Sequence, residues 1–324
     1  MTQAIRFERT GGPQVLQWVD VDVPAPGVGE IRVRHHAVGL NFIDVYFRTG
    51  LYPQPLPAGL GMEAAGEVVD VGPGVTDFAP GERIAYAARP PGAYAQERVI
   101  AASSVVKLPQ SISYEQGAAM MLQGMTAQYL LRRTYRVKAG DTILVHAAAG
   151  GVGLILCQWA KALGATVIGT VGSDEKAMLA KANGCDHPIV YTREDFAQRV
   201  KEITACRGVP VVYDSIGKDT YAGSLDCLAP FGVFVSFGNA SGPLPPINAA
   251  DLANHGSLYF TRPTLFTHIA KREDLLQISG ELFDVVQRGW VRIGIRQRYA
   301  LRDAADAHRD LEGRRTTGSS ILLP

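Results

Sequence analysis

The run from Thr142 to Gly153 constrains the fold more than any other feature of the sequence. Its first four residues are apolar or β-branched and predict a short buried strand. Small residues follow, and an amphipathic segment from Leu154 to Leu163 then predicts a helix. Small residues let the backbone approach a pyrophosphate, and a helix N-terminus offers unpaired N–H groups to it. The run therefore predicts a dinucleotide site and favours an oxidoreductase.

The glycine pattern within this run is Ala147-x-x-Gly150-x-x-Gly153, with Ala where the usual fingerprint has its first Gly. Taken alone it is a weak match, because glycine turns also occur wherever a helix packs closely on a strand. Its context supports the functional reading, because Gly164 suits a helix C-terminus and residues 166–170 predict a second strand. The residues expected to contact the cofactor at this turn are Gly150, Gly151, Val152 and Gly153.

Composition limits the possible partners. The chain has 324 residues, which suggests about two domains. Its 32 basic and 31 acidic residues give a net charge of +1 without a basic stripe, so we expect no nucleic-acid partner. The four cysteines are widely spaced, which argues against a zinc knuckle or a disulfide framework.

We expect neither a signal peptide nor a membrane-spanning helix in this sequence. The N-terminal residues lack the apolar stretch of a signal peptide, so a cytoplasmic location is expected. Residues 142–160 are uncharged, but Gly150, Gly151 and His146 favour a strand, turn and helix over a membrane span.

The composition and the hydrophobic pattern of the sequence change along its length. Residues 1–122 are rich in Gly and Pro, with short strand-like runs that predict an irregular, barrel-like β domain. From residue 123 to 262, apolar strands alternate with amphipathic helices, which predicts a doubly wound parallel sheet. Its six expected strands are 142–145, 166–170, 189–191, 211–213, 233–236 and 258–260. Residues 263–324 form a tail, with helices at 273–288 and 304–312 and strands at 299–301 and 320–323, which we expect to return to the first domain.

Several local motifs resemble one known family. They are Asn41–Tyr46 with Gly50–Pro53, Gly61–Gly66, His146–Gly153, Val212–Gly217 and Gly318–Ser320. Together they resemble the zinc-independent quinone oxidoreductase (zeta-crystallin-like) branch of the medium-chain dehydrogenase/reductase superfamily, over essentially the whole chain. The resemblance implies a GroES-like catalytic domain followed by a Rossmann NADPH-binding domain.

The residues at the expected zinc positions argue against a metal. Zinc-dependent members of this superfamily carry Cys at the position of Asn41 and Gly-His-Glu at Gly61-Met62-Glu63. An amide and a thioether are poor zinc ligands, so no metal is predicted. Without a Lewis acid, an acceptor that is already electrophilic, such as a quinone or an enone, suits the site better than a simple alcohol.

The end of the second strand indicates the cofactor. An NAD-selective site usually has an acid about 20 residues beyond the fingerprint, and none stands at Val171-Gly172. Gly172 and Ser173, with Lys176 one turn later, suit a 2′-phosphate and hence NADPH. Asp174 and Glu175 weaken this argument, and a solvated Lys176 is the alternative.

The resemblance implies further site residues. Those expected near the cofactor are Asn41, Thr126, Tyr129, Tyr191, Phe237, Gly238, Asn239, Arg262 and Arg315. Asn41, Tyr46 and Tyr52 are the candidates for orienting the acceptor, while no residue is an obvious proton donor. For each, a structural role in the core or on the surface is the alternative. His146 precedes the glycine turn, and we expect it to be a structural residue rather than a catalyst.

The predicted activity is NADPH-dependent quinone reduction. One alternative is reduction of the C=C bond of enones or alkenals. A second, of a different class, is a structural or RNA-binding role, known among relatives. The resemblance also implies a homodimer or a homotetramer formed through the sheet edge near 258–260, of which we predict the homodimer.

Overall fold

The computed structural model describes residues 2–324 and divides the chain into two compact units. The first unit combines residues 1–125, 269–287 and 293–324, and the second combines residues 126–268 and 288–292. The expected boundaries at 122/123 and 262/263 thus differ from the observed ones by a few residues. Helix α2 (Tyr114–Tyr129) runs without a break through both the expected boundary and the observed division after residue 125.

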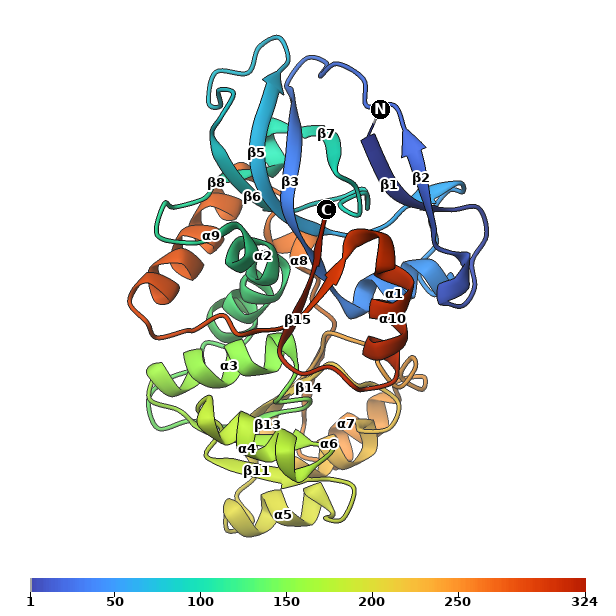
Figure 1. Ribbon diagram of the computed structural model, residues 1–324. Helices are drawn as coiled ribbons and strands as arrows, with labels where there is room; N and C mark the ends of the chain where they lie inside the picture. The colour runs from blue at the N-terminus through green and yellow to red at the C-terminus, as the bar shows by residue number, and fades with distance from the viewer. Residues whose placement is uncertain (1) are drawn as a thin grey trace. The chain divides into compact units, whose positions relative to one another are not determined.

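The first unit is built on a seven-stranded sheet and a three-stranded sheet (Figure 1). The larger sheet has the order β15-β16-β3-β5-β6-β8, with β7 also paired to β3, and the smaller has the order β2-β1-β4. Its strands are β1 (Thr2–Phe7), β2 (Gln17–Val21), β3 (Glu30–Leu40), β4 (Ala58–Gly59), β5 (Glu63–Val71), β6 (Arg83–Ala87), β7 (Glu97–Ala101), β8 (Val106–Lys107), β15 (Ile295–Ala300) and β16 (Ser319–Leu323). Its other helices are α1 (Phe42–Thr49), α9 (Arg272–Gln287) and α10 (Ala304–Glu312).

Both ends of the chain contribute to the larger sheet. Strand β16 pairs antiparallel with the C-terminal half of β3, where Ile321 faces Gly39, and parallel with β15. Ile321 is fully buried, so the closing strand belongs to the core of this unit.

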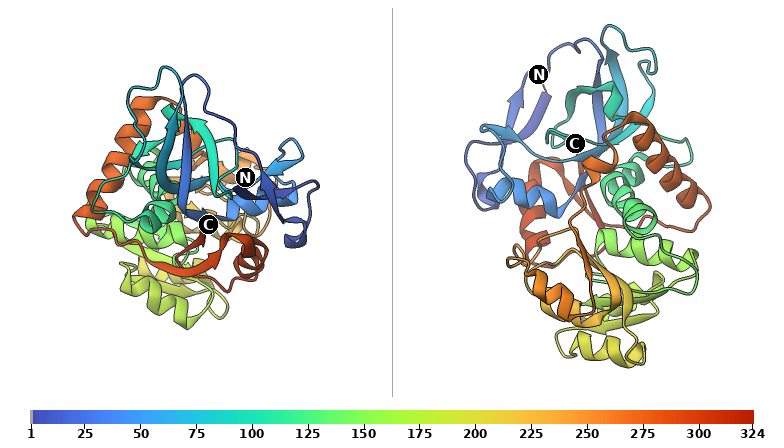
Figure 2. Two further views of the ribbon diagram at one scale, coloured as in Figure 1. Left: turned by 45° about the horizontal axis from the view of Figure 1, so that its top comes forward. Right: turned by 180° about the vertical axis from the view of Figure 1, so that it is seen from behind.

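The second unit is a six-stranded parallel sheet in the order β11-β10-β9-β12-β13-β14. Figure 2 shows these strands from behind, with the chain running from green to orange. The strands are β9 (Thr142–Val145), β10 (Thr166–Val171), β11 (His187–Val190), β12 (Val209–Asp214), β13 (Leu228–Ser236) and β14 (Tyr259–Thr261). The helices are α3 (Gly151–Ala162), α4 (Asp174–Ala182), α5 (Phe196–Ile203), α6 (Tyr221–Cys227), α7 (Ala249–Asn254) and α8 (Leu265–His268).

This strand order confirms the predicted doubly wound sheet. Numbered along the chain, its strands run 3-2-1-4-5-6, which places the switch in strand order between β9 and β12. A continuous apolar core lies under the strands, including Leu144, Val212 and Phe234, all fully buried. The carboxyl ends of β9 and β12, where dinucleotides bind in such sheets, are therefore fixed by packing.

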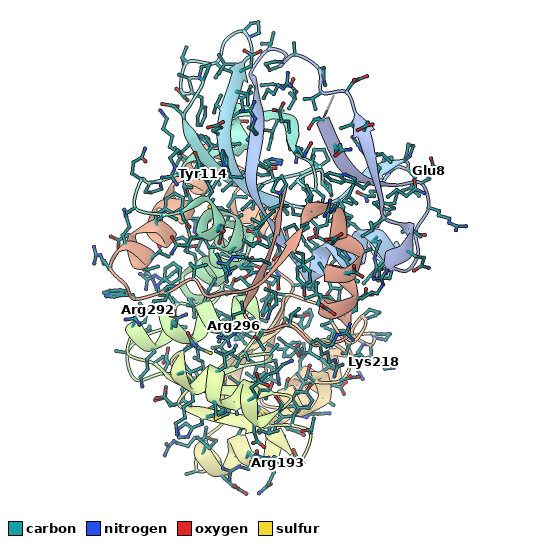
Figure 3. The ribbon with its side chains drawn as sticks, in the orientation of Figure 1. Glu8, Tyr114, Arg193, Lys218, Arg292 and Arg296 are labelled. Carbon is teal, nitrogen blue, oxygen red and sulfur yellow. The ribbon has the colours of Figure 1, made fainter. Side chains whose placement is uncertain are left out.

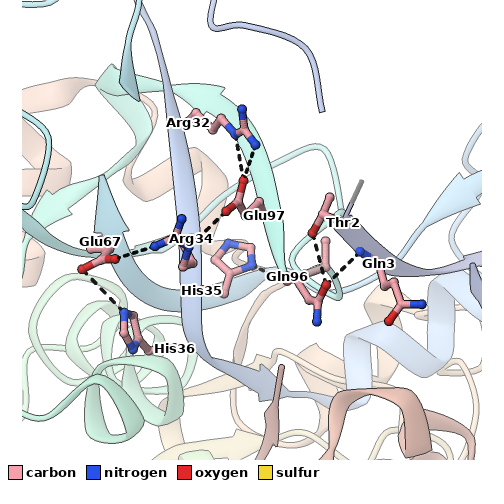
Figure 4. Close-up of polar contacts among 10 residues, drawn as sticks. Thr2, Gln3, Arg32, Arg34, His35, His36, Glu67, Gln96 and Glu97 are labelled. Atoms are coloured by element: carbon pink, nitrogen blue, oxygen red, sulfur yellow. Dashed lines mark hydrogen bonds and ion pairs between the residues drawn. The ribbon is translucent and has the colours of Figure 1, made fainter. Parts of the chain in front are cut away.

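Ion pairs cross the outer surface of the first unit's sheet (Figure 4). Arg34 on β3 lies opposite Glu97 on β7 and Glu67 on β5, and its guanidinium is 3.1 Å and 3.2 Å from their carboxylates. Arg32 binds the same Glu97 at 2.6 Å. Directly opposed charges of unlike sign support the pairing of three strands, although exposure limits their contribution to stability.

No helix within residues 2–324 is long and apolar enough to cross a bilayer.

Candidate functional site

The predicted dinucleotide turn joins β9 to α3, and its geometry requires small residues. Ala147 adopts a left-handed conformation with φ of 53°. A Cβ atom on Gly153 would lie 2.2 Å from the carbonyl oxygen of Ala147 and 2.8 Å from the Cα of Ala148. Gly153 therefore lets α3 start directly against the turn, as a helix that approaches a pyrophosphate must.

The start of α3 is open to a ligand. Gly150 is its N-cap residue, in extended conformation, and no side chain caps the helix. The first N–H groups of the helix thus keep the anion-binding capacity of a helix N-terminus. A helix that begins directly after a turn of alanine and glycine residues is the geometry expected where a dinucleotide phosphate binds.

His146 has the structural role that its position before the turn suggested. Its two ring nitrogens lie 2.8 Å from Thr170 Oγ1 and 2.9 Å from Ser224 Oγ. Burial lowers the pKa of His146, so the ring stays neutral. A buried, neutral and fully hydrogen-bonded imidazole joins β9, β10 and α6.

Four predicted cofactor residues come together beyond the end of β10. Ser173 is the N-cap of α4, and its hydroxyl accepts the backbone N–H of Lys176 at 3.3 Å. The backbone N–H of Tyr191 donates to Val171, and a Cβ on Gly172 would lie 3.1 Å from the Tyr191 hydroxyl. Gly172, Ser173, Lys176 and Tyr191 therefore lie at one corner of the sheet.

The acid at this corner already has a partner. Arg193 Nη1 lies 2.6 Å from Asp174 Oδ2, and a second guanidinium nitrogen binds the other carboxylate oxygen. Figure 3 labels Arg193 in the second unit. Sequence reasoning missed Arg193, although its place two residues after Tyr191 was a usable signal. In the sequence, Asp174 weakened the argument for NADPH over NADH. Its ion pair with Arg193 reduces that weakness, since a carboxylate bound by arginine is less available to a ribose.

The loop after β13 packs closely on the loop after β12. A Cβ on Gly238 would lie 2.4 Å from the carbonyl oxygen of Ser215, and the Phe237 N–H donates to Asp214. Arg262 donates to the carbonyl of Ser236 at 2.9 Å. Phe237, Gly238, Asn239 and Arg262 thus belong to one cluster at the carboxyl ends of β12 and β13.

Thr126 and Tyr129 occupy the last turns of α2, and both are buried. The ring of Tyr129 stacks on His268 with a centroid distance of 4.4 Å. Burial raises the pKa of Tyr129, which keeps its hydroxyl neutral. His268 was not identified from the sequence, because no motif surrounds it.

Arg315 has a partner in its own unit. Its guanidinium binds Asp310 at 2.6 Å, and Tyr299 donates to the same carboxylate at 2.9 Å. The cofactor contact expected for Arg315 therefore competes with an ion pair.

Asn41 lies at the junction of β3 and α1, and its side chain is 5% exposed. Its backbone N–H donates to Asp44 Oδ2 at 2.9 Å, while its side-chain nitrogen donates to Glu63 Oε1 at 2.6 Å. Its side-chain oxygen accepts from Gln123 at 3.1 Å. The amide of Asn41 is therefore held from two sides, and Asn41 is also the N-cap residue of α1, in a capping box with Asp44.

Tyr46 and Tyr52 belong to an aromatic cluster. Their rings lie 5.2 Å apart in an edge-on arrangement, and Phe47 makes a similar contact with Tyr52 at 5.7 Å. Tyr46 is 7% exposed, while Tyr52 is partly exposed. The two rings predicted to orient an acceptor are thus neighbours on and just after α1.

Two buried carboxyl groups accompany Asn41. Burial raises the pKa of Asp44 to about 7 and that of Glu63 to about 8. Glu63 Oε2 accepts the backbone N–H of Leu122 at 2.6 Å. Sequence reasoning placed Glu63 only as part of a former zinc motif and missed that it contacts Asn41.

The donor set around Asn41 does not fit zinc. Met62 is fully buried, and both polar atoms of the Asn41 amide are hydrogen-bonded to protein groups. Within residues 2–324, no three His, Cys, Asp or Glu side chains gather as a metal site would need.

A mixed β domain followed by a doubly wound sheet with a turn of alanine and glycine residues before its first helix is the architecture of the dehydrogenase/reductase class. The family models agree, since residues 27–131 match the alcohol dehydrogenase GroES-like domain and residues 151–277 match the zinc-binding dehydrogenase domain. The chain is 55% identical to the quinone oxidoreductase of Pseudomonas aeruginosa, over 100% of both proteins.

Two further relatives bear on function. The crystal structure of Escherichia coli quinone oxidoreductase complexed with NADPH has a TM-score of 0.98 at 50% identity, covering 99% of this chain and 100% of that one. The 2-haloacrylate reductase of a Burkholderia species is 48% identical, over 100% of this chain and 99% of its own. This chain thus belongs to the quinone oxidoreductase family of the medium-chain dehydrogenase/reductases, as its motifs predicted.

Proposed function

We propose that this protein is an NADPH-dependent, zinc-independent reductase of quinones. The observation that carries the proposal is the turn at Gly153, where a Cβ would lie 2.2 Å from Ala147 O, in a family with an NADPH-bound member. The second unit would bind the cofactor and the first unit the acceptor.

The corner beyond β10 supports NADPH over NADH. Lys176 and the hydroxyl groups of Ser173 and Tyr191 supply a cation and hydrogen-bond donors for a 2′-phosphate. Of the two carboxylates near this corner, Asp174 is bound by Arg193, while Glu175 is exposed in the first turn of α4.

The remaining cofactor contacts are proposed from the same geometry. The turn residues would bind the pyrophosphate, and the cluster after β13 would lie along the nicotinamide half. The full set is Asn41, Thr126, Tyr129, Gly150, Gly151, Val152, Gly153, Gly172, Ser173, Lys176, Tyr191, Phe237, Gly238, Asn239, Arg262 and Arg315.

The chain's own residues would orient the acceptor. The bound nicotinamide supplies a hydride to an electrophilic acceptor. Asn41 retains one N–H beyond its bond to Glu63, and that N–H is a donor for an acceptor carbonyl oxygen. The rings of Tyr46 and Tyr52 would form the apolar wall beside it. No group is assigned as a dedicated acid, because solvent can protonate a reduced quinone.

A reductase of activated C=C bonds is the second candidate. The full-length similarity to a 2-haloacrylate reductase favours it. An electron-poor alkene accepts hydride without a Lewis acid, as a quinone does.

One screen separates these two functions. Purified protein is mixed with NADPH or NADH and a panel of quinones, alkenones, 2-haloacrylate and aldehydes, and cofactor oxidation is followed. We expect quinones to give the highest kcat/KM with NADPH. No oxidation with any quinone would overturn the proposal, and a higher kcat/KM for the alkenes would favour the second candidate.

The cofactor preference has its own test. In Lys176→Ala, loss of a cation beside a 2′-phosphate should raise the Kd for NADPH by about tenfold, the value of one charge-assisted hydrogen bond. The Kd for NADH should stay constant. Lys181→Ala on the same helix is the control, and an unchanged ratio of the two Kd values would disprove the role of Lys176.

We further propose a cytoplasmic homodimer. Strand β14 ends the sheet of the second unit, and its Tyr259 is 62% exposed. An unpaired edge with an exposed aromatic ring suits pairing with a second copy. A sedimentation measurement should give twice the chain mass, and Tyr259→Lys should shift it toward the monomer.

A further inference from the structure

A buried chain of side-chain hydrogen bonds connects Ser319 to Glu63. Ser319 Oγ donates to Gln123 Oε1 at 2.7 Å, and Gln123 Nε2 donates to Asn41 Oδ1 at 3.1 Å. Asn41 Nδ2 then donates to Glu63 Oε1 at 2.6 Å. The four side chains come from β16, α2, the start of α1 and β5, and none is more than 5% exposed. We call this set the amide chain.

Each amide in this chain is fixed by its neighbours. A primary amide has a donor end and an acceptor end, so reversing one amide requires reversing the next. When Glu63 is ionised it only accepts, which forces the Asn41 nitrogen toward it and the Asn41 oxygen toward Gln123. Ser319 completes this direction by donating to the Gln123 oxygen.

A proton on Glu63 permits the opposite direction. A neutral carboxyl group can donate to the Asn41 oxygen, the Asn41 nitrogen can then donate to Gln123, and Gln123 can donate to the Ser319 hydroxyl. Both directions keep the three contacts between neighbouring side chains of the amide chain. The two directions exchange the positions of the Asn41 side-chain oxygen and nitrogen. The N–H of Asn41 that is not bonded within the amide chain therefore points to a different place in each direction.

Close backbone contacts hold Glu63 in place. A Cβ on Gly39 of β3 would lie 2.3 Å from Glu63 Oε1 and 2.4 Å from the carbonyl oxygen of Ala118. Only glycine leaves room for the carboxyl group between β3 and α2. The second oxygen of Glu63 is anchored by Leu122 N–H at 2.6 Å, so the first oxygen remains directed at Asn41.

We propose that Gln123, Ser319 and Glu63 are positioning residues, which orient the Asn41 amide so that its remaining N–H binds the oxygen of the electron acceptor. This inference rests on the proposed function. None of the three touches the acceptor; they act through Asn41.

The protonation of Glu63 then controls the direction of the chain. Burial raises the pKa of Glu63 to about 8. The titratable groups that face Glu63 are Asp44, Tyr86 and Tyr94, of which Asp44 adds to the rise as a like charge. Ionisation of Glu63 locks the direction seen in this structure, so kcat/KM for the quinone should rise as the pH passes about 8.

Glu63→Gln is the decisive variant. The oxygen of the introduced glutamine would keep the bond from Leu122 N–H, which turns the new side-chain nitrogen toward Asn41 and forces the reversed direction. Volume and hydrogen-bond number are retained, so the protein should fold. We expect kcat/KM for the quinone to fall about tenfold, the value of one hydrogen bond, with KM for NADPH within twofold of wild type. The rise near pH 8 should disappear.

Ser319 provides a second, independent variant. Ser319→Ala removes the donor to Gln123 and should lower kcat/KM for the quinone. Ser319→Thr keeps a hydroxyl group and should retain the wild-type kcat/KM. Two controls match these changes within the same unit. Ser279→Ala removes a buried hydroxyl bonded to Leu275 O, and Glu97→Gln neutralises a carboxylate away from Asn41. Both should retain wild-type kinetics.

The outcomes are distinguishable. The inference would be overturned if both Glu63→Gln and Ser319→Ala kept the wild-type kcat/KM for the quinone and the wild-type pH profile. It would also be overturned if each loss of kcat/KM came with a matching loss of thermal stability and a matching rise in KM for NADPH. A wild-type protein inactive with all quinones would overturn the proposed function instead. In that case, side-chain amide NMR of Asn41 still decides whether Glu63→Gln reverses the chain, and an unreversed amide would refute the inference.

Discussion

Glu63 and Asp44 are carboxyl groups that the fold keeps away from water. Their polar partners are N–H and O–H groups, with Tyr94 donating to Asp44 at 3.0 Å and Asn41 donating to both. Neutral donors stabilise a buried carboxylate less than a cation does, so burial raises both pKa values. The protein therefore holds these protons at pH values where an unfolded chain has released them.

This difference predicts an unusual pH dependence of stability. The pKa of Glu63 rises from 4.5 to about 8 on folding, so between these values the folded state binds more protons. The free energy of unfolding of wild type should consequently fall, relative to that of Glu63→Gln, as the pH rises from about 4.5 to about 8. Denaturant unfolding at several pH values measures the difference.

Glu97→Gln is the control for which the pH dependence of the free energy of unfolding should have the opposite sign. Burial acts to raise the pKa of Glu97, but Arg32 and Arg34 outweigh it and lower the pKa. The stability that this carboxylate gives is lost as the pH falls. A difference between wild type and Glu63→Gln that is independent of pH would contradict the assigned protonation.

Single residues also mark how far the sequence could predict the site. Asn41, Gly153 and Ser173 were identifiable because each belongs to a local motif with a backbone reason. Gln123 and Arg193 were not, because their importance depends on partners 82 and 19 residues away. Contacts of that separation exist only once strands and helices have packed.

At the scale of elements, the turn after β12 supports the loop after β13, which we propose lies along the nicotinamide half of the cofactor. Asp214 is fully buried, and its Oδ1 accepts the N–H groups of Ile216 at 2.6 Å and Gly217 at 3.0 Å. Its Oδ2 accepts the Thr220 hydroxyl at 2.6 Å. This carboxylate shapes the turn on which Gly238 rests.

Removing that support should affect both stability and binding. Asp214→Ala leaves buried donors unsatisfied, and we expect a loss of at least about 2 kcal/mol in unfolding free energy. KM for NADPH should rise, because Ser215 no longer fixes the loop at Gly238. Asp214→Asn keeps the oxygen for both N–H groups and should lose much less on each measure. Equal effects of the two substitutions would contradict this account.

Elements of the second unit were predicted closely, because hydrophobic periodicity defines a parallel sheet. Strand β9 lies at the predicted residues 142–145, and β10 begins at the predicted residue 166 and ends one residue later than predicted. The last predicted strand, 258–260, lies one residue further on as β14. In the first unit the strands are longer than the predicted runs, since β3 extends from Glu30 to Leu40 through polar residues that pair across strands.

At the scale of the whole molecule, the first unit depends on a strand from the far end of the chain. Ile321→Ala in β16 should cost about 2–4 kcal/mol, the usual loss for a large buried aliphatic side chain. Hydrogen exchange should quicken in β3, β15 and β16, and remain slow in the sheet β9–β14. Leu323→Ala, at a less buried position of the same strand, should have a smaller effect. Exchange that quickened equally in both sheets would show that the units unfold together.

The placement of β16 also sets an order for biosynthesis. Residues 126–268 are continuous, so the nucleotide-binding sheet can form on the ribosome as soon as they emerge. Strand β3 is made early, yet the residues of β16 that pair with Val38–Leu40 are translated 280 to 284 residues later (320 − 40 and 322 − 38). During that interval the nascent chain carries an open strand edge beside Asn41, which is the kind of surface that chaperones shield.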